Sequence, residues 1–77
     1  MDIYEEVKRV AKAMKSLGFI AASEDILRSF EEGATGGEIS MIIRFKLKKV
    51  AHGGVVNDRH LLAEIDSLVK KLDSLLS

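Results

Sequence analysis

The fold class of this chain depends on one segment, residues 35–51, whose sequence is TGGEISMIIRFKLKKVA. Every second residue from Ile39 to Leu47 is apolar, which is the pattern of a strand with one buried face. The same segment also has apolar residues at the spacing of one helix face, namely Ile39, Ile43, Leu47 and Val50. Such a short apolar segment therefore fits both periods, and features outside the pattern must decide between them.

Two features favour the helix. Thr35 followed by Glu38 has the form of a capping box, which opens a helix. No other segment has the pattern of a second strand, and a lone strand would leave its backbone N–H and C=O groups unpaired. We therefore predict a helix over residues 36–51. The alternative is a strand over residues 39–48, which would make the fold α+β.

The first helix is predicted over residues 3–17, where apolar residues recur at 4-3-4-3 spacing. Asp2 can cap this helix, and Glu5 can complete a capping box. Gly18 can adopt the left-handed conformation that often ends a helix, and Phe19 can fold back as the apolar contact of that ending.

Two more helices are predicted, over residues 24–32 and 58–76. Ser23 is expected to begin the first of them and Gly33 to end it. Asn57 is expected to cap the second, which repeats large aliphatic residues at 4-3-4-3 spacing almost to the end of the chain.

The composition is that of one soluble globular domain. A chain of 77 residues is too short for two cores, and 47% hydrophobic residues are too many for a disordered chain. The absence of cysteine excludes disulfides and zinc fingers, and no apolar run approaches a membrane span. The acidic beginning is unlike a secretory leader, so we expect a cytoplasmic protein. The predicted fold is all-α, a small four-helix bundle forming a single domain over residues 1–77.

Motifs for catalysis and cofactor binding are weak. The glycine-rich turn at residues 33–37 precedes a helix, but Glu38 places a negative charge where a phosphate would bind. Four residues could approach a metal, namely His52, Asp58, His60 and Glu64. Ordinary surface groups are the better interpretation, since a metal site needs three or four converging ligands. We expect no metal, no cofactor and no catalytic activity.

The charge pattern is more informative. Residues 23–37 hold four acids and one base, a net charge of −3, and residues 38–52 hold four bases and one acid, a net charge of +3. Glu31 and Glu32 lie at the predicted end of a helix, where the helix dipole disfavours negative charge. A compensating cation is therefore expected, either within the chain, from Lys48 or Lys49, or on a partner.

The basic run at residues 44–49 suggests nucleic-acid binding as an alternative function, because clustered cations release counterions from phosphates. Three features weigh against it. Phe45 and Leu47 are expected in the core rather than stacked on bases, the chain is neutral overall, and an acidic segment directly precedes the run.

The apolar residues are more numerous than one small bundle is expected to bury, so the remainder should form an interaction patch. We therefore predict a protein-binding helical domain without a membrane partner. It would be a self-associating adaptor, forming a homodimer or higher oligomer, or an inhibitor of a protein partner in the manner of immunity proteins and antitoxins. The residues expected to contact the partner are the two misplaced acids, nearby bases and outer aliphatic residues of the last helix: Glu31, Glu32, Arg44, Lys48, Lys49, Leu62, Val69 and Leu76.

Overall fold

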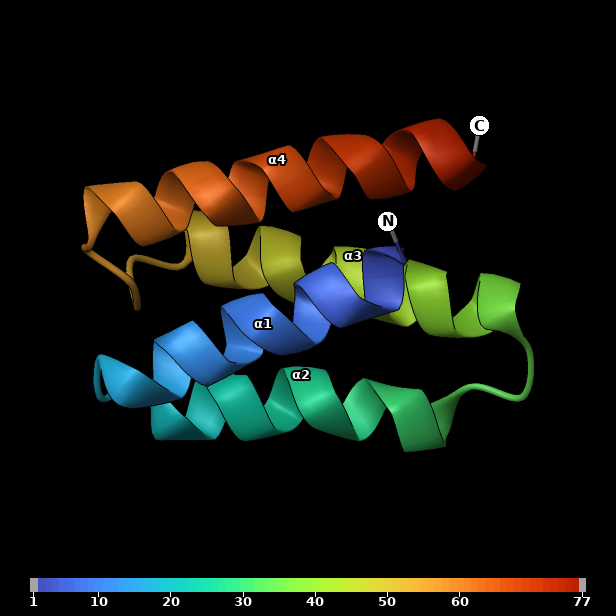
Figure 1. Ribbon diagram of the computed structural model, residues 1–77, viewed down its shortest axis with the longest axis horizontal. Coiled ribbons are helices and arrows are strands. Elements are labelled where there is room, and N and C mark those ends of the chain that lie inside the picture. Colours follow the sequence, from blue (N-terminus) through green and yellow to red (C-terminus); the bar gives the residue numbers. More distant parts are fainter. Residues whose placement is uncertain (1, 77) are drawn as a thin grey trace.

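The computed structural model describes residues 2–76, which form four helices and no strand (Figure 1). The helices are α1 (Ile3–Ser16), α2 (Ile20–Glu32), α3 (Gly36–His52) and α4 (Arg59–Leu76). The predicted all-α four-helix fold is confirmed, and the α+β alternative is wrong.

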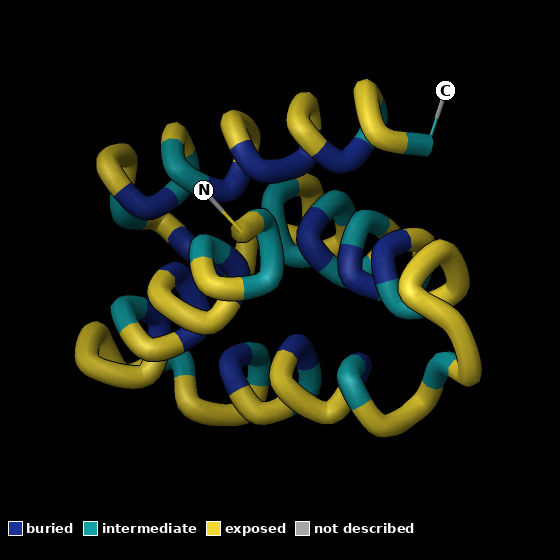
Figure 2. Tube along the Cα trace, turned by 45° about the vertical axis from the view of Figure 1, so that its right-hand side comes forward, coloured by how far each residue is buried: buried dark blue, intermediate teal, exposed yellow. Residues whose placement is uncertain are grey.

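Each helix packs against two others, so that α1 and α3 both contact α2 and α4. In Figure 1, α4 and α2 lie at opposite edges of the bundle, with α1 and α3 between them. Figure 2 shows that the buried parts of the helices face the interior. The core consists of these buried apolar residues: Val7, Val10, Ala11, Met14, Ile26, Ile43, Leu47, Val56, Leu61, Ile65, Leu68, Val69 and Leu72.

The turn between α1 and α2 forms as predicted. Gly18 has a φ of +96°, and its N–H donates to the carbonyl of Lys15 at 3.1 Å. The N–H of Phe19 donates to the carbonyl of Met14 at 2.9 Å, and its side chain packs against the core. These two hydrogen bonds are those of a Schellman motif, which requires the left-handed glycine.

The predicted start of α2 is wrong. The helix begins at Ile20, directly after the Schellman turn, and the N–H of Ser23 donates to the carbonyl of Phe19 at 3.0 Å. Ser23 is therefore an interior residue of α2 and not its N-cap. Its buried Oγ donates to the carbonyl of Ala11 at 2.6 Å, where the small serine lets α1 and α2 approach closely.

The cap of α3 forms as predicted. Thr35 Oγ1 accepts from the N–H of Glu38 at 3.2 Å, and Glu38 Oε2 accepts from the N–H of Ala34 at 3.2 Å. The return bond of the capping box thus goes to the residue before the cap. Ile43 and Leu47 are fully buried, as the helical period predicts.

Of the other two predicted caps, Asp2 is correct and Asn57 is wrong. Asp2 caps α1, but its carboxylate accepts from the N–H of Tyr4 at 3.0 Å and not from that of Glu5. At α4, the cap is Asp58 and not Asn57, because Asp58 Oδ1 accepts from the N–H of Leu61 at 2.9 Å. Asn57 and Asp58 both precede the apolar period of α4, so the sequence alone does not show which of the two is the cap.

Replacing Thr35 with alanine removes the acceptor for the Glu38 N–H. We expect the free energy of unfolding to fall by about 0.5–2 kcal/mol, measured by urea denaturation. Asn57→Ala is the matched control and should leave stability unchanged, because Asn57 is exposed and does not cap α4. Equal losses for the two variants would contradict the assigned caps.

Candidate interaction surfaces

The acid at the end of α2 has an internal counterion. Lys46 of α3 forms an ion pair with Glu32, and its Nζ lies 3.3 Å from Asp25 Oδ1. Lys46 Nζ also donates to the carbonyl of Asp25 at 2.9 Å, and its side chain is only 12% exposed. The cation expected near Glu32 is therefore Lys46, and not Lys48 or Lys49.

Lys46 belongs to the basic run 44–49 but is not among the residues predicted to contact a protein partner, although the helical period contains a signal for its position. It lies one turn before Val50 and next to Leu47 on the helix, at the edge of the face that enters the core. A lysine at that edge can bury its methylene stem and direct its ammonium to a neighbouring helix. The sequence could not show that the neighbour on that side is α2.

Arg44 and Lys48 turn toward α4 instead. Arg44 Nε and Lys48 Nζ lie 2.5 Å and 3.9 Å from the same oxygen, Oδ1 of Asp73. One carboxylate therefore serves two cations, so this part of the surface keeps a positive charge. Lys49 is exposed, and no ion pair is found for it within residues 2–76.

The remaining residues expected to contact a partner lie in different places. Glu31 is exposed on α2, and the described part of the chain provides no ion pair for it. Leu62 and Leu76 are half-buried, and Leu62 packs against the core. Val69 is only 8% exposed and belongs to the core, so it presents little surface to a partner.

Two large apolar residues on α3 are exposed one turn apart. Phe45 is 69% exposed and Met41 is 58% exposed, on the side of the helix opposite Ile43 and Leu47. The expectation that Leu47 lies in the core is correct, whereas the expectation for Phe45 is wrong. Met41 is not among the residues predicted to contact a partner, although the same helical period places it beside Phe45.

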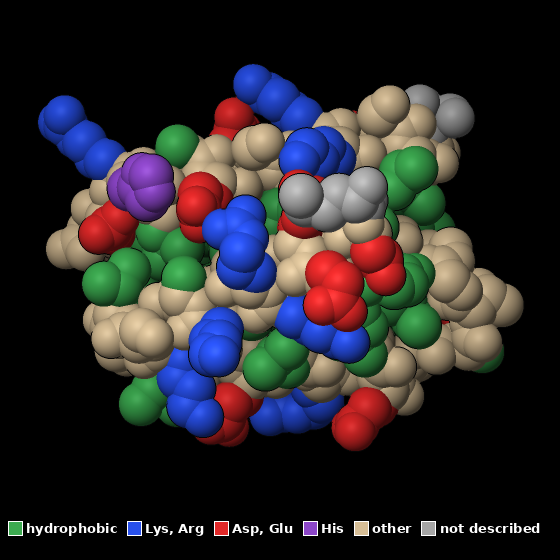
Figure 3. Space-filling model, viewed as in Figure 1, with side chains coloured by type: hydrophobic (Ala, Val, Ile, Leu, Met, Phe, Trp, Pro, Cys, Tyr) green, Lys and Arg blue, Asp and Glu red, His purple; other side chains and the backbone are tan. Residues whose placement is uncertain are grey.

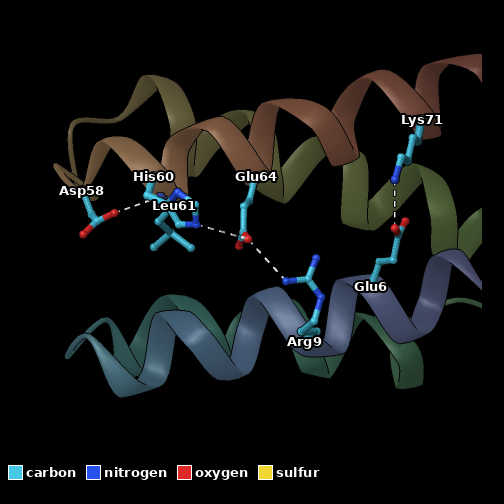
Figure 4. Close-up of polar contacts among 7 residues, drawn as sticks. All are labelled: Glu6, Arg9, Asp58, His60, Leu61, Glu64 and Lys71. Atoms are coloured by element: carbon cyan, nitrogen blue, oxygen red, sulfur yellow. Dashed lines mark hydrogen bonds and ion pairs between the residues drawn. The ribbon is translucent and has the colours of Figure 1, made fainter.

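A shallow groove of about 220 Å³ runs between α1 and α4 and is lined by charged residues. Figure 4 shows Glu64 directed toward Arg9 and His60, with its Oε1 at 3.3 Å from Arg9 Nη1 and 3.7 Å from His60 Nε2. Further along, Lys71 Nζ lies 2.8 Å from Glu6 Oε1. The acids of this groove are thus engaged by bases, and no cluster of three potential metal ligands occurs among residues 2–76.

The role of Lys46 can be tested by replacing it with methionine, which keeps most of the apolar stem but removes the ammonium. We expect the free energy of unfolding to fall by about 1–2 kcal/mol, since a largely buried, charged hydrogen bond is lost. Lys49→Met is the matched control and should be close to neutral in urea denaturation. If Lys49→Met destabilises the protein as much as Lys46→Met, the pairing of Lys46 with α2 is not what stabilises it.

No protein-family model matches this chain. No significant similarity to a curated protein or to a solved structure was found. Within the part of the chain that the structure describes, no helix combines the length and the apolar composition needed to cross a bilayer.

Proposed function

We propose that this chain is a small protein-binding domain that recognises its partner with the outer face of α3. This face consists of Met41, Phe45, Lys48 and Lys49. The observation that carries the proposal is the exposure of Phe45 and Met41, at 69% and 58%, on a helix whose other face is fully buried.

Burial of the two apolar side chains against a partner would supply binding free energy. Burying a phenylalanine or methionine side chain contributes about 1.5–3 kcal/mol. Aromatic residues and methionine are enriched in protein interfaces, and methionine adapts its shape to irregular surfaces. Phe45 and Met41 lie next to each other, so both can enter one apolar depression of a partner.

The charges around these residues favour an acidic partner. Lys49 has no ion pair within residues 2–76, and Lys48 shares Asp73 with Arg44. An acidic surface on the partner would complement this excess of positive charge. Such complementarity mainly speeds and orients the encounter, whereas the buried apolar residues supply most of the affinity.

The proposed function requires only that the chain bind its partner, without catalysis. An adaptor would use the α3 face to hold its partner, and an inhibitor of the immunity-protein or antitoxin kind would use it to cover the partner's working surface. The expectation that the chain has no catalytic activity is part of this proposal.

Nucleic-acid binding remains the second candidate, because an exposed Phe45 beside Lys49 is an arrangement on which a base can stack. The other cations of the basic run support it less. Lys46 is engaged by α2, while Arg44 and Lys48 share an acid of α4.

Selection of peptides from a random display library tests the proposal. We expect the selected peptides to combine acidic residues with an apolar residue. Phe45→Ser should weaken their binding by roughly 30-fold, the effect of losing an interface anchor. Leu75→Ser is the matched control, because Leu75 is 63% exposed but lies on α4. Selection of no peptide, or equal binding by the wild type and Phe45→Ser, would contradict the proposal.

Titration with a mixed-sequence single-stranded oligonucleotide separates the second candidate. The protein-binding proposal predicts no saturable binding at about 50 mM salt. A nucleic-acid-binding domain would bind there and lose affinity steeply by about 200 mM salt. That outcome, abolished by Phe45→Ser, would replace the proposed function with the second candidate.

A further inference from the structure

A second exposed face lies along the line where α1 and α2 pack together. On α2, Ser23 bonds to α1, and the ring of Phe30 packs edge-on against Tyr4 of α1, with ring centres 5.4 Å apart. Ile20 and Leu27 continue the same stripe of α2 but remain 49% and 39% exposed. An apolar row therefore runs along the boundary between the two helices.

Three lysines border this row on α1. Lys8 lies over the ring of Phe30, with Nζ 5.2 Å from the ring centre, so it faces α2. Lys12 and Lys15 follow at helical spacing, and all three lysines are exposed. In the described range 2–76, none of the three takes part in an ion pair.

Two acids border the row on the α2 side. Glu24 and Glu31 are exposed, and neither has an ion pair within the described residues. Figure 3 shows blue side chains over α1 and toward α2, with green side chains beside them, and red side chains at the lower edge and also over the N-terminal end of α1. Beside this row, the middle of α1 thus carries positive charge and α2 carries the two acids. Glu5 at the start of α1 is also exposed, and Arg28 lies beside the two acids of α2 but pairs with Asp25 at 3.7 Å.

We infer that this face binds a second copy of the same chain. A two-fold axis parallel to the helices would place α1 of each copy over α2 of the other. Lys8 and Lys12 of each copy would then meet Glu24 of the other copy, and the two apolar rows would cover each other. A two-fold axis across the helices would instead place lysines over lysines and acids over acids, which is unfavourable.

The levels of the charged residues along the axes of α1 and α2 support the same arrangement. The hydrogen bond from Ser23 Oγ to the Ala11 carbonyl places these two residues at one level along the antiparallel helices. Glu24, one residue further along α2, lies at a level between Lys8 and Lys12 of α1, within about 3 Å of each along the axis. Rotation about an axis parallel to the helices keeps this level, so Glu24 comes opposite Lys8 and Lys12 of the second copy.

The dimer leaves the outer face of α3 free, because α1 and α3 occupy opposite corners of the bundle. Two copies would then present two α3 faces, and a two-site adaptor gains avidity without new contacts. The α1–α2 face shares no residue with the α3 face, so dimerisation stands independently of the proposed function.

Sedimentation equilibrium and a charge exchange test the dimer. The wild type at tens of micromolar should have twice the 8.5 kDa mass of one chain. The double variant Lys8→Glu with Lys12→Glu and the single variant Glu24→Lys should each remain monomeric, because like charges then face each other. An equimolar mixture of the two variants should regain the doubled mass, because both contacts again join opposite charges.

Two controls make the result decisive. Circular dichroism should show native helix content in both variants, since none of the three substituted residues has an ion pair within the described chain. Phe45→Ser should dimerise like the wild type while losing its peptides, so the dimer and the α3 proposal can fail separately. A wild-type mass of one chain, variants that still dimerise, or folded variants that do not associate when mixed would each overturn the inference.

Discussion

The burial of Ile43 and Leu47 fixes the rotation of α3 about its own axis, and the surfaces of the molecule depend on that rotation. Both side chains are fully buried, and each contributes about 1.5–3 kcal/mol by leaving water. Once they face the core, Lys46 turns to α2 and Arg44 turns to α4. Phe45 is left on the outside.

The acids of α2 lie in two different environments in this fold. Lys46 neutralises the end of α2 from a largely buried position, so this pairing joins α2 to α3. Glu24 and Glu31 of the same helix remain exposed on its other side. Although the net charge of the chain is zero, the acids on one side of α2 have internal partners, and Glu24 and Glu31 on the other side have no ion pair within residues 2–76.

Most of the fold was predictable because local physics and the apolar period agree. The stripes of α1 and α4, the Gly18 turn and the Thr35 cap required no knowledge of tertiary structure. The start of α2 was not predictable, because Ser23 has the side chain of an N-cap and the packing against α1 overrides that local preference. The cap of α4 was predicted at Asn57, whereas the next residue, Asp58, is the cap.

The candidate surfaces were less predictable than the fold. A period shows which side of a helix faces the core, but it does not show which helix lies beside each edge. Lys46 was missed for that reason, and Val69 was expected at a partner surface although it lies in the core. Phe45 was assigned to the core by its chemical type, whereas its position in the helical period placed it outside.

The rotation of α3 can be measured directly, because the chain contains no cysteine. Four single-cysteine variants, at Met41, Ile43, Phe45 and Leu47, would be reacted with a small thiol reagent under native conditions. The structure predicts that the cysteines at 41 and 45 react as fast as an unfolded peptide. Those at 43 and 47 should be slowed by the free energy of opening the core. Equal protection at all four positions would contradict this account, because it is the pattern of a strand with one buried face.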